Sequence, residues 1–548
     1  MSDFVASFTS AHMDAPPAEP QATRLVRNLR RASIFIPVSM LLIGLFITAL
    51  HWYMTRNGTD IPMESPYFVN NIVTLHAIER LGGTDSWNPM LAVRDWLWGN
   101  PDSDAYEHFF FGLGTKFQYP LTSLLAVQWL PLGGASAIRF LNILAVLAWI
   151  AIAPGMMLLD LQLARLLALP GLSGQRDGRL WLMGCAALGT LCFYPLMRAV
   201  YLGQIQIFLD ALFVFACYFL ARGQSKWAGI LIGLSALVKP QMALFLLWGA
   251  VRRDLAFVTG AAVCCVLGYF ISGILYGWGW PVSYLHVLGF IGQHGESFYA
   301  NQSLDGLLDR MIGNGPNLIW DARHFAPYNA FIHVMTVLFT LVMITAALWV
   351  GRMATTPLAG MTSFMLAALC FTAASPVAWE HHYGIMLPLF SLIFLALLRN
   401  GPGPMPRGAL WACLTVTFTL VANSLAPLNF LADTALNILQ SYLFVAALGV
   451  GVLVFLLRHD LAGPRAGDRL PYSCPKICNS RKQPRGDCSV QRQALSSALP
   501  NSHAAKTCAI TTVPILALKQ PVLRRKWHWQ HCRVKSPHIP LSSIWMAP

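Results

Sequence analysis

Charged residues are scarce in this chain. Asp, Glu, Lys and Arg together make up 11% of its 548 residues, whereas an ordinary soluble domain carries about 25%. Hydrophobic residues account for 56%, and the mean hydropathy is +0.53. Apolar runs of roughly 17–25 residues, long enough to cross a bilayer as helices, recur along the sequence. These features exclude a soluble globular protein of this size and predict an all-α polytopic membrane protein.

The few charges are spread unevenly. Residues 458–548 hold 15 of the 38 basic residues and only 3 of the 24 acidic ones, so the remaining chain is almost neutral despite a total net charge of +14. A nucleic-acid-binding surface is therefore not expected on the folded part. We predict that 458–548 is a basic, disordered cytoplasmic tail, able to lie against anionic lipid.

Metal and cofactor motifs are also missing. Cys474 and Cys478 form one C-x3-C spacing without a matching second pair, and most cysteines outside the tail lie in apolar runs. The chain has no P-loop, dinucleotide fingerprint or HExxH helix. The sequence thus predicts no metal ligands and no cofactor, and leaves open whether a divalent metal takes part.

The N-terminal part sets the predicted orientation. Four arginines precede an apolar segment at 33–53 that has no small-residue cleavage site, so we expect a retained anchor with 1–32 in the cytoplasm. Residues 54–118 then form a 65-residue external loop with eight acids and four bases, whose aromatic residues predict short helices along the membrane interface. This pattern is typical of a multi-pass protein of the plasma membrane.

Further apolar segments complete a bundle of roughly 10–13 transmembrane or re-entrant helices. They lie at 138–159, 180–197, 205–220, 255–275, 328–350, 357–377, 384–398, 408–424 and 434–457. A second external loop covers 277–327, and the C-terminus is expected in the cytoplasm. The topology leaves two alternatives open: either 119–132 does not cross fully, or 161–169 adds a crossing.

One segment predicts a broken helix. Residues 227–238 and 241–250 are each too short to span a bilayer, and Lys239-Pro240 separates them. Positive charges at both outer ends favour a re-entrant pair with Lys239 at its apex. Irregular backbone at such a depth must face protein or a water-filled cavity.

Polar residues converge on the predicted external side. They are Asp60 and Glu64 after the first span, Arg198, Gln204 and Gln206 between two spans, Lys239 at the helix break, Asn301, Gln302 and Ser303 in the second loop, and Trp379, Glu380, His381 and His382 at a helix start. Ionisable groups are costly near a bilayer and so mark a functional site. A carboxylate can deprotonate a hydroxyl, and cations or imidazolium groups can stabilise a phosphate leaving group.

Five segments in order also resemble glycosyltransferase family 87, a family of the GT-C superfamily that uses polyprenyl-phosphate sugars. They are Phe117–Leu125, Gly203–Gln206, Gly229–Pro240, Asn301–Leu304 and Ser375–His382. Two departures stand out, because Leu121 replaces the second proline of the Tyr-Pro-Pro segment and Gln206 replaces the asparagine of Gly-Gln-x-Asn. The resemblance covers about 33–457.

The resemblance implies a GT-C-like catalytic domain at 33–457 and an inverting transfer of a sugar, typically mannose, to a glycan or glycolipid acceptor on the external face. It implies a catalytic Asp in the first loop, and Asp60 is favoured over Glu64 because it follows the span directly. We expect the donor phosphate to bind His381, His382, Lys239 and Arg198. Predicted substrate-binding residues are Tyr119, Gln204, Gln206, Asn301, Gln302, Ser303, Trp379 and Glu380.

Other interpretations of these residues exist. A transporter or lipid flippase would also hold polar groups in the membrane, but paired broken helices in related halves are expected there, and this chain has one Lys-Pro break and no internal repeat. The acids can be solvated loop residues, and the His pair can reach the interface as snorkelling side chains. Gln204 and Gln206 can simply satisfy backbone groups at a helix end.

Overall fold

The computed structural model describes residues 21–56, 83–101, 103–399 and 406–463. Within these ranges the secondary structure is helical, and an isolated antiparallel bridge joins Asn301 to Trp379. The segment 1–20 and the predicted tail beyond 463, with Cys474 and Cys478, lie outside the described residues.

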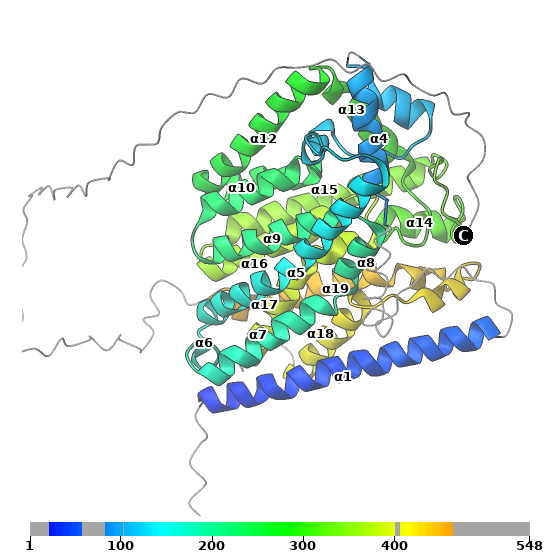
Figure 1. The fold of residues 1–548 in the computed structure, drawn as a ribbon. Coiled ribbons are helices and arrows are strands. Elements are labelled where there is room, and N and C mark those ends of the chain that lie inside the picture. Colours follow the sequence, from blue (N-terminus) through cyan, green and yellow to red (C-terminus); the bar gives the residue numbers. More distant parts are fainter. Residues whose placement is uncertain (1–20, 57–82, 102, 400–405, 464–548) are drawn as a thin grey trace, which may run out of the picture. The chain divides into compact units, whose positions relative to one another are not determined.

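The described part of the chain contains five helices long and apolar enough to cross a membrane (Figure 1). They are α5 (Gly134–Leu166), α12 (Leu255–Tyr276), α15 (Ala330–Met353), the run of η4 (Glu380–Met386) and α17 (Leu387–Leu398), and the run of η6 (Asn437–Ser441) and α19 (Tyr442–Leu456). The pair α7 (Arg176–Leu191) and α8 (Tyr194–Leu202), bent by 45°, makes a sixth if the two helices form one span. The prediction of an all-α polytopic membrane protein is confirmed.

Shorter apolar helices fill the bundle between these spans. They are α9 (Gln206–Ala221), α10 (Ser225–Ala236), η3 (Pro240–Ala243) with α11 (Leu244–Val251), α16 (Pro357–Ala373) and α18 (Arg407–Val421). Buried aromatic rings join α9, α11 and α16 in the core: Phe364 lies 5.4 Å from Phe213 and 4.7 Å from Phe245 between ring centroids. Such pairs favour one packing arrangement among apolar helices, where the lipid supplies no hydrophobic drive.

Helix α10 packs along α12 through small residues. A Cβ added at Gly229 would meet the backbone carbonyl of Phe257, and one added at Gly260 would meet that of Lys226. Small residues let helix backbones approach closely inside a membrane. This packing fixes the N-terminal half of α10 against α12.

The helix break at Lys239 is confirmed. Helix α10 ends at Ala236, Lys239 has an extended backbone with φ −123°, and η3 begins at Pro240. Proline forces the preceding residue out of the helical region, which explains the position of the break. A re-entrant path for the two halves stays a prediction.

The alternatives left open for 119–132 are now resolved. Residues Leu121–Ala126 form only a short 3-10 helix, η2, and α5 is one continuous helix of 33 residues. The first alternative, a segment that does not cross fully, is therefore correct. At the N-terminus, α1 (Gln21–Arg56) is longer than the predicted span at 33–53 and packs against α6 (Pro170–Ser173) and α7.

The two predicted external loops contain short helices. These are α4 (Trp87–Gly99) and the π-helix η1 (Glu107–Gly112) in the first, and α13 (Trp280–His294) and α14 (Leu304–Ile312) in the second. Aromatic contacts join the loops, with ring centroids of Tyr106 and Tyr284 5.4 Å apart and those of Phe110 and Phe290 5.7 Å apart. The loops therefore form one packed layer over the helix ends that carry the polar residues.

Candidate active site

The segment before η4 is held by two side chains of the second loop. Asn301 donates from Nδ2 to the carbonyl of Pro376 at 3.1 Å, and its Oδ1 accepts from the backbone amide of Ala378 at 2.9 Å. Ser303 Oγ donates to the same Pro376 carbonyl at 2.7 Å and accepts from the amide of Gly306, capping α14. Both side chains are buried. They fix the backbone that leads into Trp379.

Gln302 extends this scaffold to a third element. Its Nε2 donates to the carbonyls of Tyr299 and Gln440, and its Oε1 accepts from the amides of Leu443 and Phe444 at 3.2 and 3.3 Å. The buried Gln302 amide thus satisfies free backbone groups at the start of α19, as buried polar groups require. The Asn-Gln-Ser motif holds η4 in place, and direct substrate contact by these residues stays a prediction.

The first residue of η4 is a buried carboxylate with three partners. Glu380 accepts from the Tyr194 hydroxyl at 2.6 Å and from the Tyr442 hydroxyl at 3.2 Å. Arg198 Nε lies 3.8 Å from Glu380 Oε2, and both side chains are buried. Helices α8 and α19 are therefore tied to η4 through Glu380. The sequence predicted that Glu380 binds substrate and that Arg198 binds the donor phosphate. It did not indicate either tyrosine, because a tyrosine within an apolar segment is not distinguished from a core residue.

A group of ionisable side chains surrounds the helix break. Lys239 interacts electrostatically with Asp210 of α9 and with His381 and His382 of η4, and Arg198 also acts on His381. Lys239 and His382 are half-buried, whereas Asp210 and His381 are buried. The structure thus brings together the four residues predicted to bind a phosphate. Lys239 and Arg198 can offset the negative charge of such a group, and the two imidazole rings can donate hydrogen bonds to it.

Asp210 is the acid that sequence reasoning missed. Its Oδ1 accepts from Gln206 Nε2 at 2.7 Å, four residues earlier on α9. A Cβ at Gly384 would collide with its carboxylate, so Asp210 packs directly against η4. The signal was present, because an acid inside an apolar helix is a functional candidate by itself. Gln206 therefore holds Asp210, and substrate contact by Gln206 stays a prediction.

Gln204 and Tyr119 meet at the first loop. Gln204 Oε1 accepts from Ser86 Oγ at 2.8 Å and from Tyr119 Oη at 3.2 Å, and Gln204 Nε2 donates to Asp85 at 3.3 Å. Both predicted side chains are half-buried. The turn that carries Gln204 is itself close-packed, since Gly203 adopts φ +68° and a Cβ there would meet the Gly83 carbonyl. These contacts anchor the first loop beside the first turn of α9.

The predicted catalytic carboxylates, Asp60 and Glu64, lie outside the described residues. The first loop is described again from Gly83, and its Asp85 side chain is exposed. Among the described residues, no group of three or more His, Cys, Asp or Glu side chains is arranged to hold a metal ion.

A buried ion pair joins the two loops near η4. Lys116 Nζ lies 2.7 Å from Glu296 Oε2, and both side chains are less than a tenth exposed. Burial raises the pKa of Glu296 to about 7 and lowers the pKa of Lys116, and the mutual attraction of the pair opposes both shifts. This pair fixes the first loop to the segment that carries Asn301.

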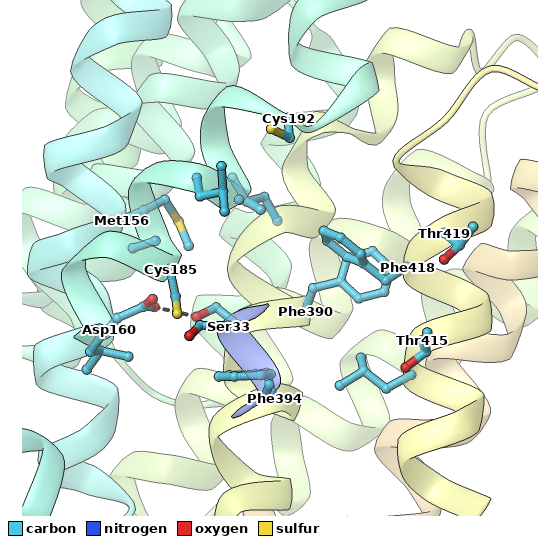
Figure 2. Close-up of a pocket in the computed structure, with 18 residues that line it drawn as sticks. Ser33, Met156, Asp160, Cys185, Cys192, Phe390, Phe394, Thr415, Phe418 and Thr419 are labelled. Atoms are coloured by element: carbon cyan, nitrogen blue, oxygen red, sulfur yellow. Dashed lines mark hydrogen bonds between the residues drawn. The ribbon is translucent and has the colours of Figure 1, made fainter. Parts of the chain in front are cut away.

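An apolar pocket lies elsewhere in the bundle, between α1, α5, α7, α17 and α18 (Figure 2). Its aromatic side comprises Phe390, Phe394 and Phe418, and its polar end holds Asp160, which accepts a hydrogen bond from Ser391. None of the residues predicted to act on substrate lines it. The polar cluster around Lys239, rather than this pocket, is the candidate active site.

Comparison with known proteins identifies the family that this chain resembles. The sequence model of glycosyltransferase family 87 matches residues 117–376. A polyprenol-phosphate-mannose-dependent alpha-(1-2)-phosphatidylinositol mannoside mannosyltransferase of Mycobacterium tuberculosis is 29% identical over 318 residues, covering 56% of this chain and 68% of the relative. A protein of the same name in Mycolicibacterium smegmatis is 26% identical over 329 residues, with the same coverage.

A third relative is matched over a longer stretch. It is a polyprenol-phosphate-mannose-dependent alpha-(1-2)-phosphatidylinositol pentamannoside mannosyltransferase of Mycolicibacterium smegmatis, 26% identical over 424 residues, or 74% of this chain and 84% of the relative. The family match begins at Phe117, within the first of the motif segments, and reaches Pro376, three residues before Trp379. The family model covers slightly less than half of the chain, which is therefore similar to glycosyltransferase family 87. Together with the helical membrane fold, these matches identify the chain as a membrane glycosyltransferase.

Proposed function

We propose that this protein transfers mannose from polyprenyl-phosphate-mannose to a glycolipid or glycan acceptor, with inversion, on the external face of the plasma membrane. The relatives' names specify that donor for those proteins and phosphatidylinositol mannosides as their acceptors. The observation that carries the proposal is the convergence of Lys239, Arg198, His381 and His382 beside η4.

The donor phosphate is the leaving group of this reaction. Negative charge develops on its oxygen as the bond to the sugar breaks, and cations held in a water-poor site stabilise that charge strongly. Lys239 is the most suitable ligand, because it lies at a helix break and is half-buried. His382 is likewise half-buried and can donate to a phosphate oxygen, while the buried Arg198 adds positive charge near His381.

The acceptor hydroxyl must lose a proton as it attacks the sugar. A carboxylate within hydrogen-bond reach serves as the general base. Asp60 is our first candidate and Glu64 the second, because both follow the first predicted span. In a single displacement the hydroxyl attacks the face of the sugar opposite the phosphate, so the configuration at the anomeric carbon inverts. Lys239 and Arg198 can offset the charge that develops on the phosphate, and the His pair can donate hydrogen bonds to it.

The decisive experiment is sugar transfer by the purified protein in lipid nanodiscs. Radiolabelled polyprenyl-phosphate-mannose is supplied with a phosphatidylinositol mannoside acceptor, and GDP-mannose serves as the control donor. We expect labelled glycolipid from the lipid-linked donor alone. NMR should show that the anomeric carbon of the new linkage has the configuration opposite to that in the donor. Transfer from GDP-mannose alone would refute the proposed donor, and retention at the anomeric carbon would refute the single displacement. Right-side-out and inverted vesicles test the face on which transfer occurs.

A further inference from the structure

Three aromatic rings form a continuous wall beside η4. The ring centroids of Trp320 and Trp379 lie 5.2 Å apart with an interplanar angle of 75°, and Phe298 lies 5.6 Å from Trp320 and 6.4 Å from Trp379. Trp379 directly precedes Glu380, whereas Trp320 is 42% exposed. The wall therefore runs from the segment that carries the His pair to the surface of the protein.

The loop that carries Trp320 is firmly anchored. The amide of Tyr299 donates to the Asn317 carbonyl at 2.9 Å, and Ser297 Oγ donates to the Pro316 carbonyl at 2.9 Å. Asn317 and Gln440 exchange reciprocal side-chain hydrogen bonds of 2.8 and 3.2 Å. Trp320 is thus presented on a fixed backbone, which lowers the entropy cost of binding a ligand.

A cation also holds the indole ring itself. Lys116 Nζ lies 4.1 Å from the centroid of Trp320 and 4.4 Å from that of Phe325, while pairing with Glu296. Cation–π contacts of this kind orient an aromatic ring. The ring of Trp320 is therefore fixed on one side by the buried ion pair and on another by Trp379, yet part of it remains open to solvent.

The position of Trp320 sets it apart from an interfacial membrane anchor. Exposed tryptophans at helix ends commonly form such anchors. Trp278 is an example: it is 53% exposed and packs on Tyr269 and Phe270 at the end of the apolar helix α12. Trp320 instead contacts the residues of the active-site segment. An aromatic ring in that place is suited to a ligand of the enzyme.

We propose that Trp320 and Trp379 form the subsite for a pyranose unit of the acceptor glycan. A pyranose ring has one face of C–H groups, which packs on an exposed indole ring while its hydroxyls stay hydrated at the rim. This inference rests on the proposed function, because it assigns the acceptor of that same reaction. The wall adjoins η4 through Trp379, so a sugar bound on Trp320 lies next to the transfer site.

The first test separates acceptor from donor binding. Octyl α-mannoside is the acceptor probe, and steady-state kinetics are measured for wild type, Trp320→Ala, Trp320→Phe and the control Trp278→Ala. We expect Trp320→Ala to raise the KM for the probe roughly tenfold, while the donor KM changes less than about twofold. Trp320→Phe retains most of the acceptor affinity, and Trp278→Ala leaves both constants unchanged. An unchanged acceptor KM, or equal increases in both constants, overturns the subsite.

The second test requires no turnover. Octyl α-mannoside is titrated into the protein without donor, and intrinsic tryptophan fluorescence is followed. A saturable change that persists in Trp278→Ala and disappears in Trp320→Ala supports the subsite, and a change that survives in Trp320→Ala overturns it. If the wild-type protein binds the probe at Trp320 but transfers no mannose from the lipid donor, the proposed function is refuted and the subsite is retained. The two failures are therefore distinguishable.

Discussion

The buried carboxylate of Glu380 accepts a hydrogen bond of 2.6 Å from the hydroxyl of Tyr194. This bond joins η4, where the His pair lies, to α8, where Arg198 lies only 3.8 Å from the same carboxylate. A buried charge of this kind persists only when hydrogen bonds and an opposite charge compensate its desolvation. The relationship supports a positioning role for Glu380, and a direct contact of Glu380 with substrate stays a prediction.

Removing the Tyr194 hydroxyl tests this positioning role. In Tyr194→Phe the carboxylate keeps Tyr442 and Arg198 but loses its shortest hydrogen bond, a loss of about 1–3 kcal/mol for a buried group. We expect the donor KM to rise and the acceptor KM to stay constant. Tyr201→Phe is the control, because Tyr201 lies on the same helix with an exposed ring. A donor KM equal to that of wild type would contradict the role given to Glu380.

Asp210 provides a second test, directed at Lys239. Asparagine at this position keeps the hydrogen bond with Gln206 but removes the negative charge that faces Lys239. We expect Asp210→Asn to weaken donor binding, and Lys239→Ala to add little in the double variant, because the two residues act as one unit.

The matched control for this pair is Asp160→Asn, which changes a buried carboxyl in the separate apolar pocket. It should leave the donor KM unchanged. Strictly additive effects of Asp210→Asn and Lys239→Ala in a double-mutant cycle would show that the two side chains are not coupled.

Much of the fold could be predicted, because apolar length determines membrane helices directly. The predicted span at 255–275 matches α12 within one residue at its C-terminal end, and the break at Lys239 follows from proline chemistry. The prediction was incomplete where apolar composition does not imply a helix. The apolar segment 119–132 was a candidate span, yet its only helical part is the short 3-10 helix Leu121–Ala126.

The site was predictable only in part, since residue type does not reveal the partner. The sequence indicated that Lys239 and the His pair belong together. It could not show that the side chains of Asn301 and Gln302 form hydrogen bonds with backbone groups, because those partners lie far away in the chain. Tyr194 and Tyr442 were missed for the same reason: a tyrosine in an apolar segment looks like core until its hydroxyl is located.

The turn at Gly203 makes a prediction about stability. Gly203 has φ +68° and an added Cβ there would meet the Gly83 carbonyl, whereas Gly223 has φ +72° with nothing within 4 Å of an added Cβ. Gly223→Ala should lower the free energy of unfolding by about 1 kcal/mol, from backbone strain alone. Gly203→Ala should lower the free energy of unfolding clearly more than Gly223→Ala does, because the first loop must also move. Thermal unfolding midpoints in detergent measure the difference, and equal midpoints would contradict the close approach.

The ion pair of Lys116 and Glu296 predicts a pH dependence. Burial raises the pKa of Glu296 from 4.5 to about 7, so between those values the folded protein retains a proton that the unfolded chain has lost. The stability supplied by this proton is full below about pH 4.5 and declines until about pH 7.

Glu296→Gln should therefore reduce the change of the thermal unfolding midpoint with pH between about pH 5 and pH 7. Glutamine resembles the protonated acid, so the midpoint of this variant should vary less than that of wild type. Glu107→Gln is the control, because Glu107 is an exposed acid of η1. Identical pH profiles for wild type and Glu296→Gln would show that Glu296 is ionised throughout the range.

The general base remains the sharpest prediction for the chemistry. Asp60→Asn preserves size and hydrogen bonding but removes the basicity needed to deprotonate the acceptor hydroxyl, which contributes about 10²–10⁴ in rate. We expect this variant to lose transfer while it expresses normally and binds donor as wild type does, and Glu64→Gln to be milder. His382→Ala should instead raise the donor KM. Full activity in Asp60→Asn with a loss in Glu64→Gln would reverse the two assignments, and full activity in both would remove the first loop from the chemistry.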